Sequence, residues 1–201
     1  MPIRAVIFDF GGVLVRTEDW SGHHKWETHL GLPQGELAKI VFDSEISKRA
    51  ALGQVAVPEI WEHVGTTLNL TPAQVRELKQ DFWSGEQLDE ELLSFLGSLR
   101  PQYKTAILSN AWLDARETFT QIYKVGRAVD IIIISAEEGL VKPDPQLFEL
   151  AASRLEVQPD EAVFVDDFVR NVEAARSIGM KGVLFENTTQ AIAEVQNYLD
   201  G

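Results

Sequence analysis

Five short runs of apolar residues recur along the chain, and each ends at polar residues or glycine. They cover residues 3–8, 104–108, 131–134, 162–165 and 182–185. Apolar residues fill these runs almost without interruption, with many Val and Ile, which is typical of strands buried on both faces. The pattern therefore predicts five strands of a parallel sheet that is covered by helices on both sides.

A helical period separates these strands. Residues 90–99 place Leu92, Leu93 and Leu96 on one broad stripe, as expected for a helix that packs against a sheet. Similar patterns occur at residues 146–155, 171–178 and 191–199. Because strands that alternate with helices form βαβ units, we predict an α/β fold with a doubly wound parallel sheet.

One long segment breaks this alternation. No clear strand pattern occurs within residues 15–88, where helices are expected at residues 23–30, 35–43, 58–68 and 72–82. Thr71 and Gln74 flank Pro72 in the arrangement typical of a helix start, with a capping Thr and Gln three positions later. We therefore predict a core of residues 1–15 and 88–201 and an inserted helical cap of residues 16–87.

Charge and composition narrow the classes of partner. The 201 residues include 18 Lys and Arg against 31 Asp and Glu, a formal net charge of -13, and no Cys. This surface repels nucleic acids and anionic membranes, and no apolar run approaches the ~18 residues that span a bilayer. Disulfides and thiolate metal sites are excluded. Because the N-terminal residues do not resemble a signal peptide and Cys is absent, we expect a cytoplasmic protein. Its expected oligomeric state is a monomer or a homodimer.

Polar side chains follow four of the predicted strands. They are Asp9, Ser109 with Asn110, Lys142 in the loop after residues 131–134, and Asp166 with Asp167. In an open parallel sheet, ligands bind beyond the carboxyl ends of the strands, so we expect these side chains to converge. Each alone has a simpler interpretation as a turn or helix cap, and it is the convergence that indicates a site.

The chemistry of this set favours phosphoryl transfer. Asp9 ends a buried strand and could act as a nucleophile. Asp9, Asp166 and Asp167 would repel one another unless a cation lay among them, and Mg²⁺ is the divalent ion that suits such oxygen ligands. Lys142 and Ser109 could bind the oxygens of a phosphoryl group.

Four motifs resemble those of the haloacid dehalogenase superfamily, in order and along essentially the whole chain. They are FDFGGVL at residues 8–14, ILSN at 107–110, VKPDP at 141–145 and VDDFVRNVEAARSIGM at 165–180. The resemblance implies a Rossmann-like core with a helical cap inserted after the first motif. It also implies a Mg²⁺-dependent hydrolase that acts on a small phosphorylated metabolite, such as a sugar phosphate.

The resemblance assigns a role to each matching residue. Asp9 would form an aspartyl-phosphate, and Mg²⁺ would bind Asp9, Asp167 and the backbone carbonyl of Gly11, with Asp166 in support. Ser109 and Lys142 would bind phosphoryl oxygens, and Asn110 and Asn171 would orient nearby groups.

Gly11 departs from the common pattern. Most phosphatases of this superfamily carry a second Asp there, which protonates the leaving group, and such a group is typically worth ~10²–10⁴ in rate. A branch with Asp-x-Gly is nevertheless associated with phosphate ester hydrolysis. A good leaving group would need less protonation, or an acid could come from Glu18, Asp19, His23 or His24. The two histidines, at a helix start, have the simpler interpretation of surface residues.

Two other functions stay open. A hydrolytic 2-haloacid dehalogenase would use Asp9 against carbon, but such relatives typically act without a metal, and the pair Asp166–Asp167 disfavours this alternative. A catalytically degenerate binding or regulatory module would explain Gly11, but the retained Asp9, Ser109 and Lys142 disfavour it. Trp20, Trp26, Trp61 and Trp83 lie in or beside the cap, where most are expected in the core; the sequence does not select those that line an entrance.

Overall fold

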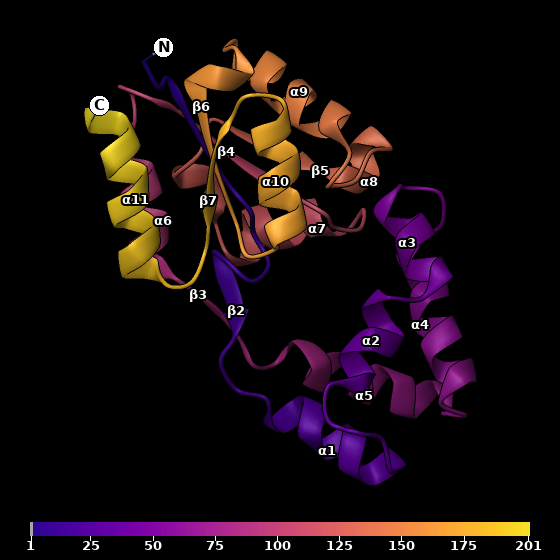
Figure 1. The fold of residues 1–201 in the computed structure, drawn as a ribbon. Coiled ribbons are helices and arrows are strands. Elements are labelled where there is room, and N and C mark those ends of the chain that lie inside the picture. Colours follow the sequence, from indigo (N-terminus) through magenta and orange to yellow (C-terminus); the bar gives the residue numbers. More distant parts are fainter. Residues whose placement is uncertain (1) are drawn as a thin grey trace.

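A five-stranded parallel sheet forms the centre of the molecule, which a computed structural model describes over residues 2–201 (Figure 1). The sheet order is β5-β4-β1-β6-β7. The strands are β1 (Ala5–Phe8), β4 (Lys104–Ser109), β5 (Ile131–Ile134), β6 (Ala162–Asp166) and β7 (Lys181–Leu184). All five strands predicted from the apolar runs are confirmed, and so is the parallel pairing of neighbours.

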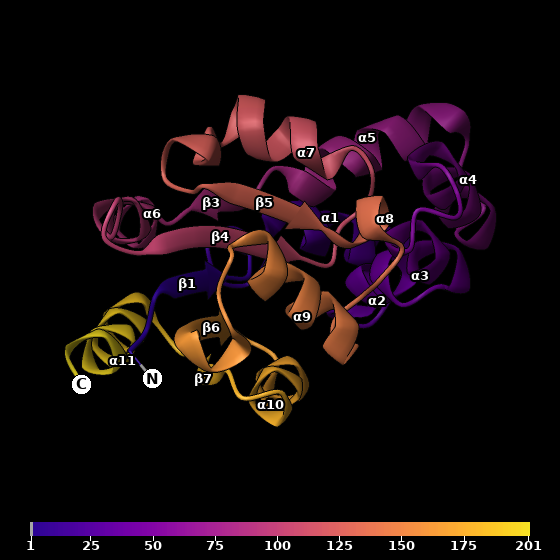
Figure 2. The same ribbon diagram turned by 90° about the horizontal axis from the view of Figure 1, so that it is seen from above.

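Helices cover both faces of this sheet (Figure 2). The helices α6 (Glu90–Ser98) and α11 (Thr188–Asp200) pack with Val6 and Phe8 of β1, whereas α9 (Pro145–Arg154) and α10 (Val169–Ser177) pack with Ala5 and Ile7. Successive residues of a strand point to opposite faces. Every residue of β1 is therefore buried, which explains its uninterrupted apolar sequence.

The helical insertion lies between β2 and β4 and has a hydrophobic core of its own. Its helices are α1 (Ser21–Leu30), α2 (Glu36–Phe42), α3 (Glu45–Ala51), α4 (Val57–Thr67) and α5 (Pro72–Trp83). Trp26, Leu37, Val64 and Leu78 are among the buried residues of that core. Four of the five helices match the predicted ones, and Thr71 caps α5 by accepting a hydrogen bond from the Gln74 backbone N–H at 3.4 Å.

Two short strands correct the expectation that residues 15–88 contain none. The strands β2 (Val15–Thr17) and β3 (Glu86–Leu88) pair in antiparallel fashion where the insertion joins the core, with Val15 opposite Leu88 (Figure 1). Each has three residues and mostly polar side chains, so neither produces a readable apolar pattern. Their partners lie about 70 residues apart along the chain, and only the tertiary fold brings them together.

Shorter elements complete the core, and the sequence did not predict them. They are α7 (Ala115–Glu117) with the π-helical turn Thr118–Ile122, the 3-10 turns Val125–Arg127 and Pro159–Glu161, and α8 (Ser135–Glu138). The short α3 was also missed; Ser44 caps it by accepting from the Ser47 backbone N–H at 3.1 Å. Within residues 2–201, each helix is too short or too polar to cross a membrane.

Candidate active site

Asp9 lies at the carboxyl end of β1, in the middle of the sheet. Its backbone N–H donates to the Val165 carbonyl at 2.8 Å, which continues the sheet by one residue. The Phe10 backbone N–H donates to Asp9 Oδ1 at 2.6 Å. These bonds fix the Asp9 carboxylate in one orientation, with one oxygen bound to the chain's own backbone.

Lys142 joins two of the predicted carboxylates. Its Nζ lies 2.8 Å from Asp9 Oδ1 and donates to Asp166 Oδ2 at 2.7 Å, and its side chain is 1% exposed. Asn110 holds the Lys142 backbone at both polar atoms, because Lys142 N–H donates to Asn110 Oδ1 at 2.7 Å and Asn110 Nδ2 donates to the Lys142 carbonyl at 2.9 Å. Asn110 thus fixes the segment from which the ammonium group reaches Asp9.

Asp166 and Asp167 differ in their hydrogen bonding. Asp166 accepts from Asn171 Nδ2 at 3.0 Å on both oxygens, from the Phe168 backbone N–H at 2.8 Å and from Lys142. Asp167 Oδ1, by contrast, is buried and finds no hydrogen-bond partner among the described residues. A buried carboxylate oxygen without a donor is costly, and a cation beside Asp167 Oδ1 would remove that cost.

The donor set fits a hard divalent cation. Asp9, Asp166 and Asp167 each offer a carboxylate oxygen, and these three oxygens lie within 4.8 Å of one another. Burial is the main reason that the pKa of Asp9 is raised to about 7. The charge of Lys142 lowers this pKa, and the charge of Asp166 raises it further. Burial, and next the charge of Asp166, also raises the pKa of Asp167. A cation among these oxygens would favour their ionised forms and would give Asp167 Oδ1 a partner.

Ser109 and Gly11 border a small polar cavity above this cluster. The cavity has a volume of about 170 Å³. It is lined by Asp9, Gly11, Ser109, Asn110, Lys142, Phe168, Arg170 and Asn171. The predicted site residues are therefore gathered at one edge of the sheet, with Asp166 and Asp167 held beside Lys142 and Asp9. Phe168 and Arg170 were missed, although both lie inside the fourth motif.

A second, larger cavity begins at the same place. Its volume is about 510 Å³, and it shares Gly11, Ser109 and Asn110 with the smaller cavity. It lies between the core and the insertion, where its wall includes Trp61 and Trp83. Trp26 is instead buried in the core of the insertion, and Trp20 is 45% exposed. No sequence pattern indicates this cavity, because its wall comes from both parts of the chain.

The four residues suggested as replacements for the missing acid at position 11 lie outside both cavities. His23 is buried, contrary to the expectation of a surface residue, because its ring packs 4.4 Å from that of Phe82 and its Nε2 lies 3.0 Å from the Phe82 carbonyl. His24 is exposed as expected. Their helix α1 lies at the end of the insertion away from the sheet (Figure 1).

Glu18 and Asp19 make local contacts instead. Glu18 accepts from Arg16 at 3.3 Å, and Asp19 accepts from the Ser21 backbone N–H at 2.8 Å. In the part of the chain that the structure describes, neither these two acids nor His23 and His24 line either cavity. The geometry therefore offers no support for any of the four as the proton donor.

Comparison with known proteins agrees with this geometry. The sequence model of the haloacid dehalogenase-like hydrolases matches residues 3–179. The chain is 29% identical to acyl-CoA dehydrogenase family member 10 of Mus musculus over 98% of its own length, but it spans only 19% of that relative. It is also 24% identical to a D-ribitol-5-phosphate phosphatase of Bacteroides thetaiotaomicron, covering 92% of the chain and 93% of the relative.

Solved structures share the fold. A crystal structure of a HAD family enzyme of Bacteroides thetaiotaomicron, in complex with magnesium and inorganic phosphate, superimposes with a TM-score of 0.76 at 19% identity. The match covers 92% of this chain and 94% of that one. At this identity, the similarity establishes the architecture of core and helical insertion alone.

Proposed function

Because the chain belongs to the haloacid dehalogenase-like hydrolases, we propose that it is a Mg²⁺-dependent phosphomonoesterase of the branch with Asp-x-Gly in the first motif. Its substrate would be a small phosphorylated metabolite, cleaved through an aspartyl-phosphate. The observation that carries this proposal is the cluster of Asp9, Asp166 and Asp167 around the buried Lys142, with Asp167 Oδ1 unpartnered among the described residues.

The residues present would hold the metal without rearrangement of the fold. Asp9, Asp167 and the carbonyl of Gly11 would bind Mg²⁺, and Asp166, whose oxygens are already occupied by Lys142 and Asn171, would support the cluster through its charge. When bound, the ion would offset the carboxylate charges and stabilise negative charge on the phosphoryl oxygens.

The chain's own residues would perform the transfer. Asp9 is buried at the strand end with one oxygen bound by the Phe10 backbone N–H, so its other oxygen would be the one that attacks phosphorus in line. Lys142 and Ser109 would bind the phosphoryl oxygens, and Asn110 would hold the backbone of Lys142 in place. Water would then hydrolyse the aspartyl-phosphate and restore Asp9. Positioning and electrostatic stabilisation are the main contributions in such reactions.

The relatives support this proposal in part. One relative is named a phosphatase of D-ribitol-5-phosphate, and a structure with the same fold contains magnesium and inorganic phosphate. A 2-haloacid dehalogenase that works without a metal would leave three clustered carboxylates beside an anionic substrate with Lys142 as their one contacting cation among the described residues, which disfavours that alternative. A cytoplasmic location, the absence of a nucleic-acid partner and the state of monomer or homodimer stay predictions.

The test is phosphate release from a panel of phosphate monoesters, measured with Mg²⁺ and with a chelator. We expect release by the wild-type chain with Mg²⁺ alone, and a loss of at least about a thousandfold in Asp9→Asn, because the nucleophile is removed. Absence of release from every ester by a folded protein that binds Mg²⁺ would overturn the proposal and favour the binding module. Release that persists in Asp9→Asn would overturn the role of Asp9.

A further inference from the structure

The two cavities meet at Gly11, Ser109 and Asn110. The smaller contains Asp9 and Lys142 and suits a phosphoryl group by its charge. A phosphate ester whose phosphorus faces Asp9 must place its alcohol part on the side away from the carboxylate. The larger cavity shares these three lining residues with the smaller one, so it is the neighbouring space in which that alcohol would lie.

Aromatic side chains form a large part of the wall of the larger cavity. Phe42, Trp83 and Trp112 meet there, with ring centroids 5.8 Å apart for Phe42–Trp112 and 6.2 Å for Trp83–Trp112. Phe10 and Phe119 stack at 3.6 Å in the same wall. Phe42 and Trp83 come from the insertion and Trp112 from the core, so these contacts close the cavity between the two parts.

The surface that lines the larger cavity is more apolar than polar. The polar side chains among its described residues are those of Lys79, Glu86, Ser109, Asn110, Asp114, Thr118 and Tyr123. A polyol hydroxyl that lies against the apolar part of this wall is buried without a hydrogen bond, which disfavours its binding there. A hydrocarbon or aromatic group would gain free energy from burial against the same side chains.

Two exposed side chains point to the same ligand chemistry. Phe42 is 47% exposed and Ile122 is 70% exposed, and both line the larger cavity. Large apolar side chains that gather at the border of a cavity commonly mark a binding site. The volume of about 510 Å³ is that of a site for a ligand larger than a simple sugar fragment.

We propose that the substrates are monophosphates of bulky apolar or aromatic alcohols, whose hydrocarbon part occupies the cavity between Trp112 and the helices α2 and α5. This inference rests on the proposed phosphatase function and names its substrate class. It replaces the sugar phosphate suggested by the family resemblance.

The test is a series of straight-chain alkyl phosphates from ethyl to decyl, with naphthyl phosphate as the aromatic member and D-ribitol-5-phosphate as the polar one. We expect kcat/KM to rise by up to about fourfold for each added methylene until the cavity is full, since each buried methylene contributes about 0.8 kcal/mol. Ribitol phosphate should be hydrolysed less efficiently than butyl phosphate.

Matched variants locate the effect. Trp112→Ala should flatten the dependence on chain length, whereas Leu113→Ala, at the adjacent residue that is 47% exposed and outside the cavity wall, should retain it. Circular dichroism and the melting temperature check that both variants fold. A flat series in the wild type, or a preference for ribitol phosphate, would overturn the apolar substrate class alone. Absence of hydrolysis of all these esters would overturn the phosphatase itself.

A second copy of the chain is the other possible occupant of this surface. Sedimentation of wild type and Trp112→Ala distinguishes it, because a dimer that dissociates in the variant would show that the aromatic wall is an interface. That outcome would also overturn the assignment of the cavity to substrate.

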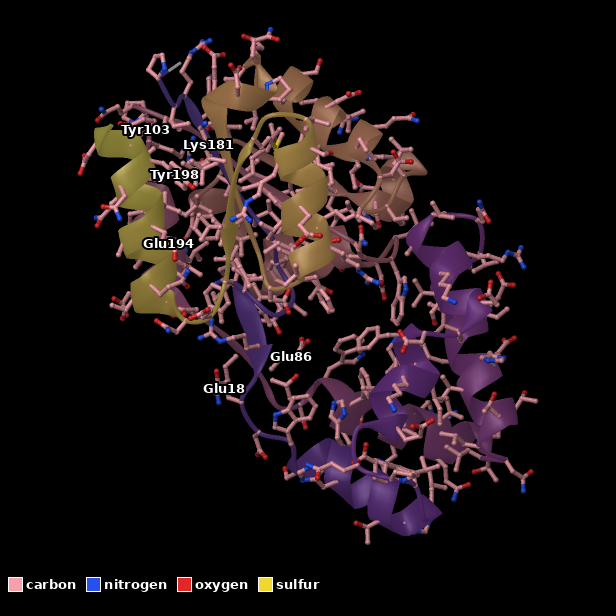
Figure 3. The ribbon with its side chains drawn as sticks, in the orientation of Figure 1. Glu18, Glu86, Tyr103, Lys181, Glu194 and Tyr198 are labelled. Carbon is pink, nitrogen blue, oxygen red and sulfur yellow. The ribbon has the colours of Figure 1, made fainter. Side chains whose placement is uncertain are left out.

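A separate observation concerns Glu86, which lies on β3 where the insertion joins the core (Figure 3). Its Oε2 accepts a hydrogen bond from the Tyr123 hydroxyl at 2.9 Å, and both residues line the larger cavity together with Gly11. Burial raises the pKa of this carboxyl. The carboxyl that position 11 lacks is thus present in the wall where the leaving alcohol would lie.

We infer that Glu86 is the proton donor. As Asp9 attacks phosphorus, the bond from phosphorus to the alcohol oxygen breaks, and that oxygen takes the proton of the Glu86 carboxyl and leaves as the neutral alcohol. The resulting carboxylate takes a proton from the water that hydrolyses the aspartyl-phosphate. Both groups then return to their starting states, and no further reagent is required.

Dependence on the leaving group tests this role. Glu86→Gln should lower kcat for alkyl phosphates by about 10²–10⁴, the usual worth of a general acid, and should change kcat for nitrophenyl phosphate little, because a nitrophenolate leaves without a proton. Glu18→Gln, at the residue that follows the neighbouring strand β2 and lies outside the cavity wall (Figure 3), is the matched control. Equal losses on both esters, or no loss on alkyl phosphates, would exclude Glu86 as the donor.

Discussion

Gly12 lies against the carboxylate of Asp167, so closely that a Cβ on Gly12 would fall 2.7 Å from Asp167 Cγ. Gly12 also has a φ of +79°, a conformation that side chains disfavour. The tight turn after β1 is thus packed directly against the carboxylate of Asp167. A side chain at position 12 would displace the oxygen that finds no partner among the described residues.

Gly12→Ala is therefore expected to impair both folding and the metal site. The left-handed backbone alone should cost about 1–2 kcal/mol of unfolding free energy, and displacement of Asp167 should remove any Mg²⁺-dependent rise in melting temperature. Gly11→Ala is the matched control, because a Cβ there has nothing within 4 Å. Urea denaturation with and without Mg²⁺ measures both effects; equal behaviour of the two variants would contradict the expected clash.

Mg²⁺ itself should stabilise the wild-type fold. A ligand at a hundred times its Kd raises the unfolding free energy by about 2.7 kcal/mol if it binds the folded state alone. We expect the melting temperature to rise with Mg²⁺ concentration, and Asp167→Asn to abolish that rise. A melting temperature that Mg²⁺ leaves unchanged in the wild type would count against the metal site at Asp9, Asp166 and Asp167.

Lys142→Met tests the charge balance of the site in a chelated sample. Loss of the ammonium group leaves Asp9 and Asp166 buried without their shared cation, and breaking such a pair typically costs about 3–5 kcal/mol. Lys142 lowers the Asp9 pKa, which burial already raises to about 7, so the variant's Asp9 should titrate higher still. The loss of stability in Lys142→Met should be small at a pH where Asp9 is protonated in both the folded wild type and the folded variant. It should grow as pH rises toward and through the wild-type Asp9 pKa of about 7.

Denaturant unfolding of Lys142→Met at several pH values measures this dependence. Lys39→Met is the control, because Lys39 pairs with Glu36 on the surface with 64% of its side chain exposed. A stability loss that is the same in mildly acidic and mildly alkaline solution would show that packing, and not charge, accounts for the effect of Lys142.

Glu86→Gln should change the dependence of stability on pH. Because the folded state raises the pKa of Glu86 above its unfolded value, chiefly through burial, the folded protein binds this proton more tightly. Its contribution to stability is present at low pH and is lost as pH rises through the folded pKa. The melting temperature of Glu86→Gln relative to wild type should therefore increase from acidic to neutral pH; a decrease would contradict the raised pKa.

Strong local patterns determined the core and the residues of its site. Each strand of the sheet was identified by its own apolar run, and polar side chains after four of the five strands identified the candidates. Asp9, Ser109 and Lys142 lie where this reasoning placed them, because the carboxyl ends of parallel strands share one edge. The same logic predicted the helical insertion between the first two strands of the sheet.

Only the tertiary structure determined those features that form where segments distant in the sequence come into contact. The pairing of β2 with β3 is too short to leave a period in the sequence, and the burial of His23 follows from its contact with Phe82 in another helix. The cavity wall joins Trp83 and Trp112 from separate parts of the chain. A helical or strand period reports only which face of an element is buried, whereas a binding cavity is defined by which faces are brought opposite one another.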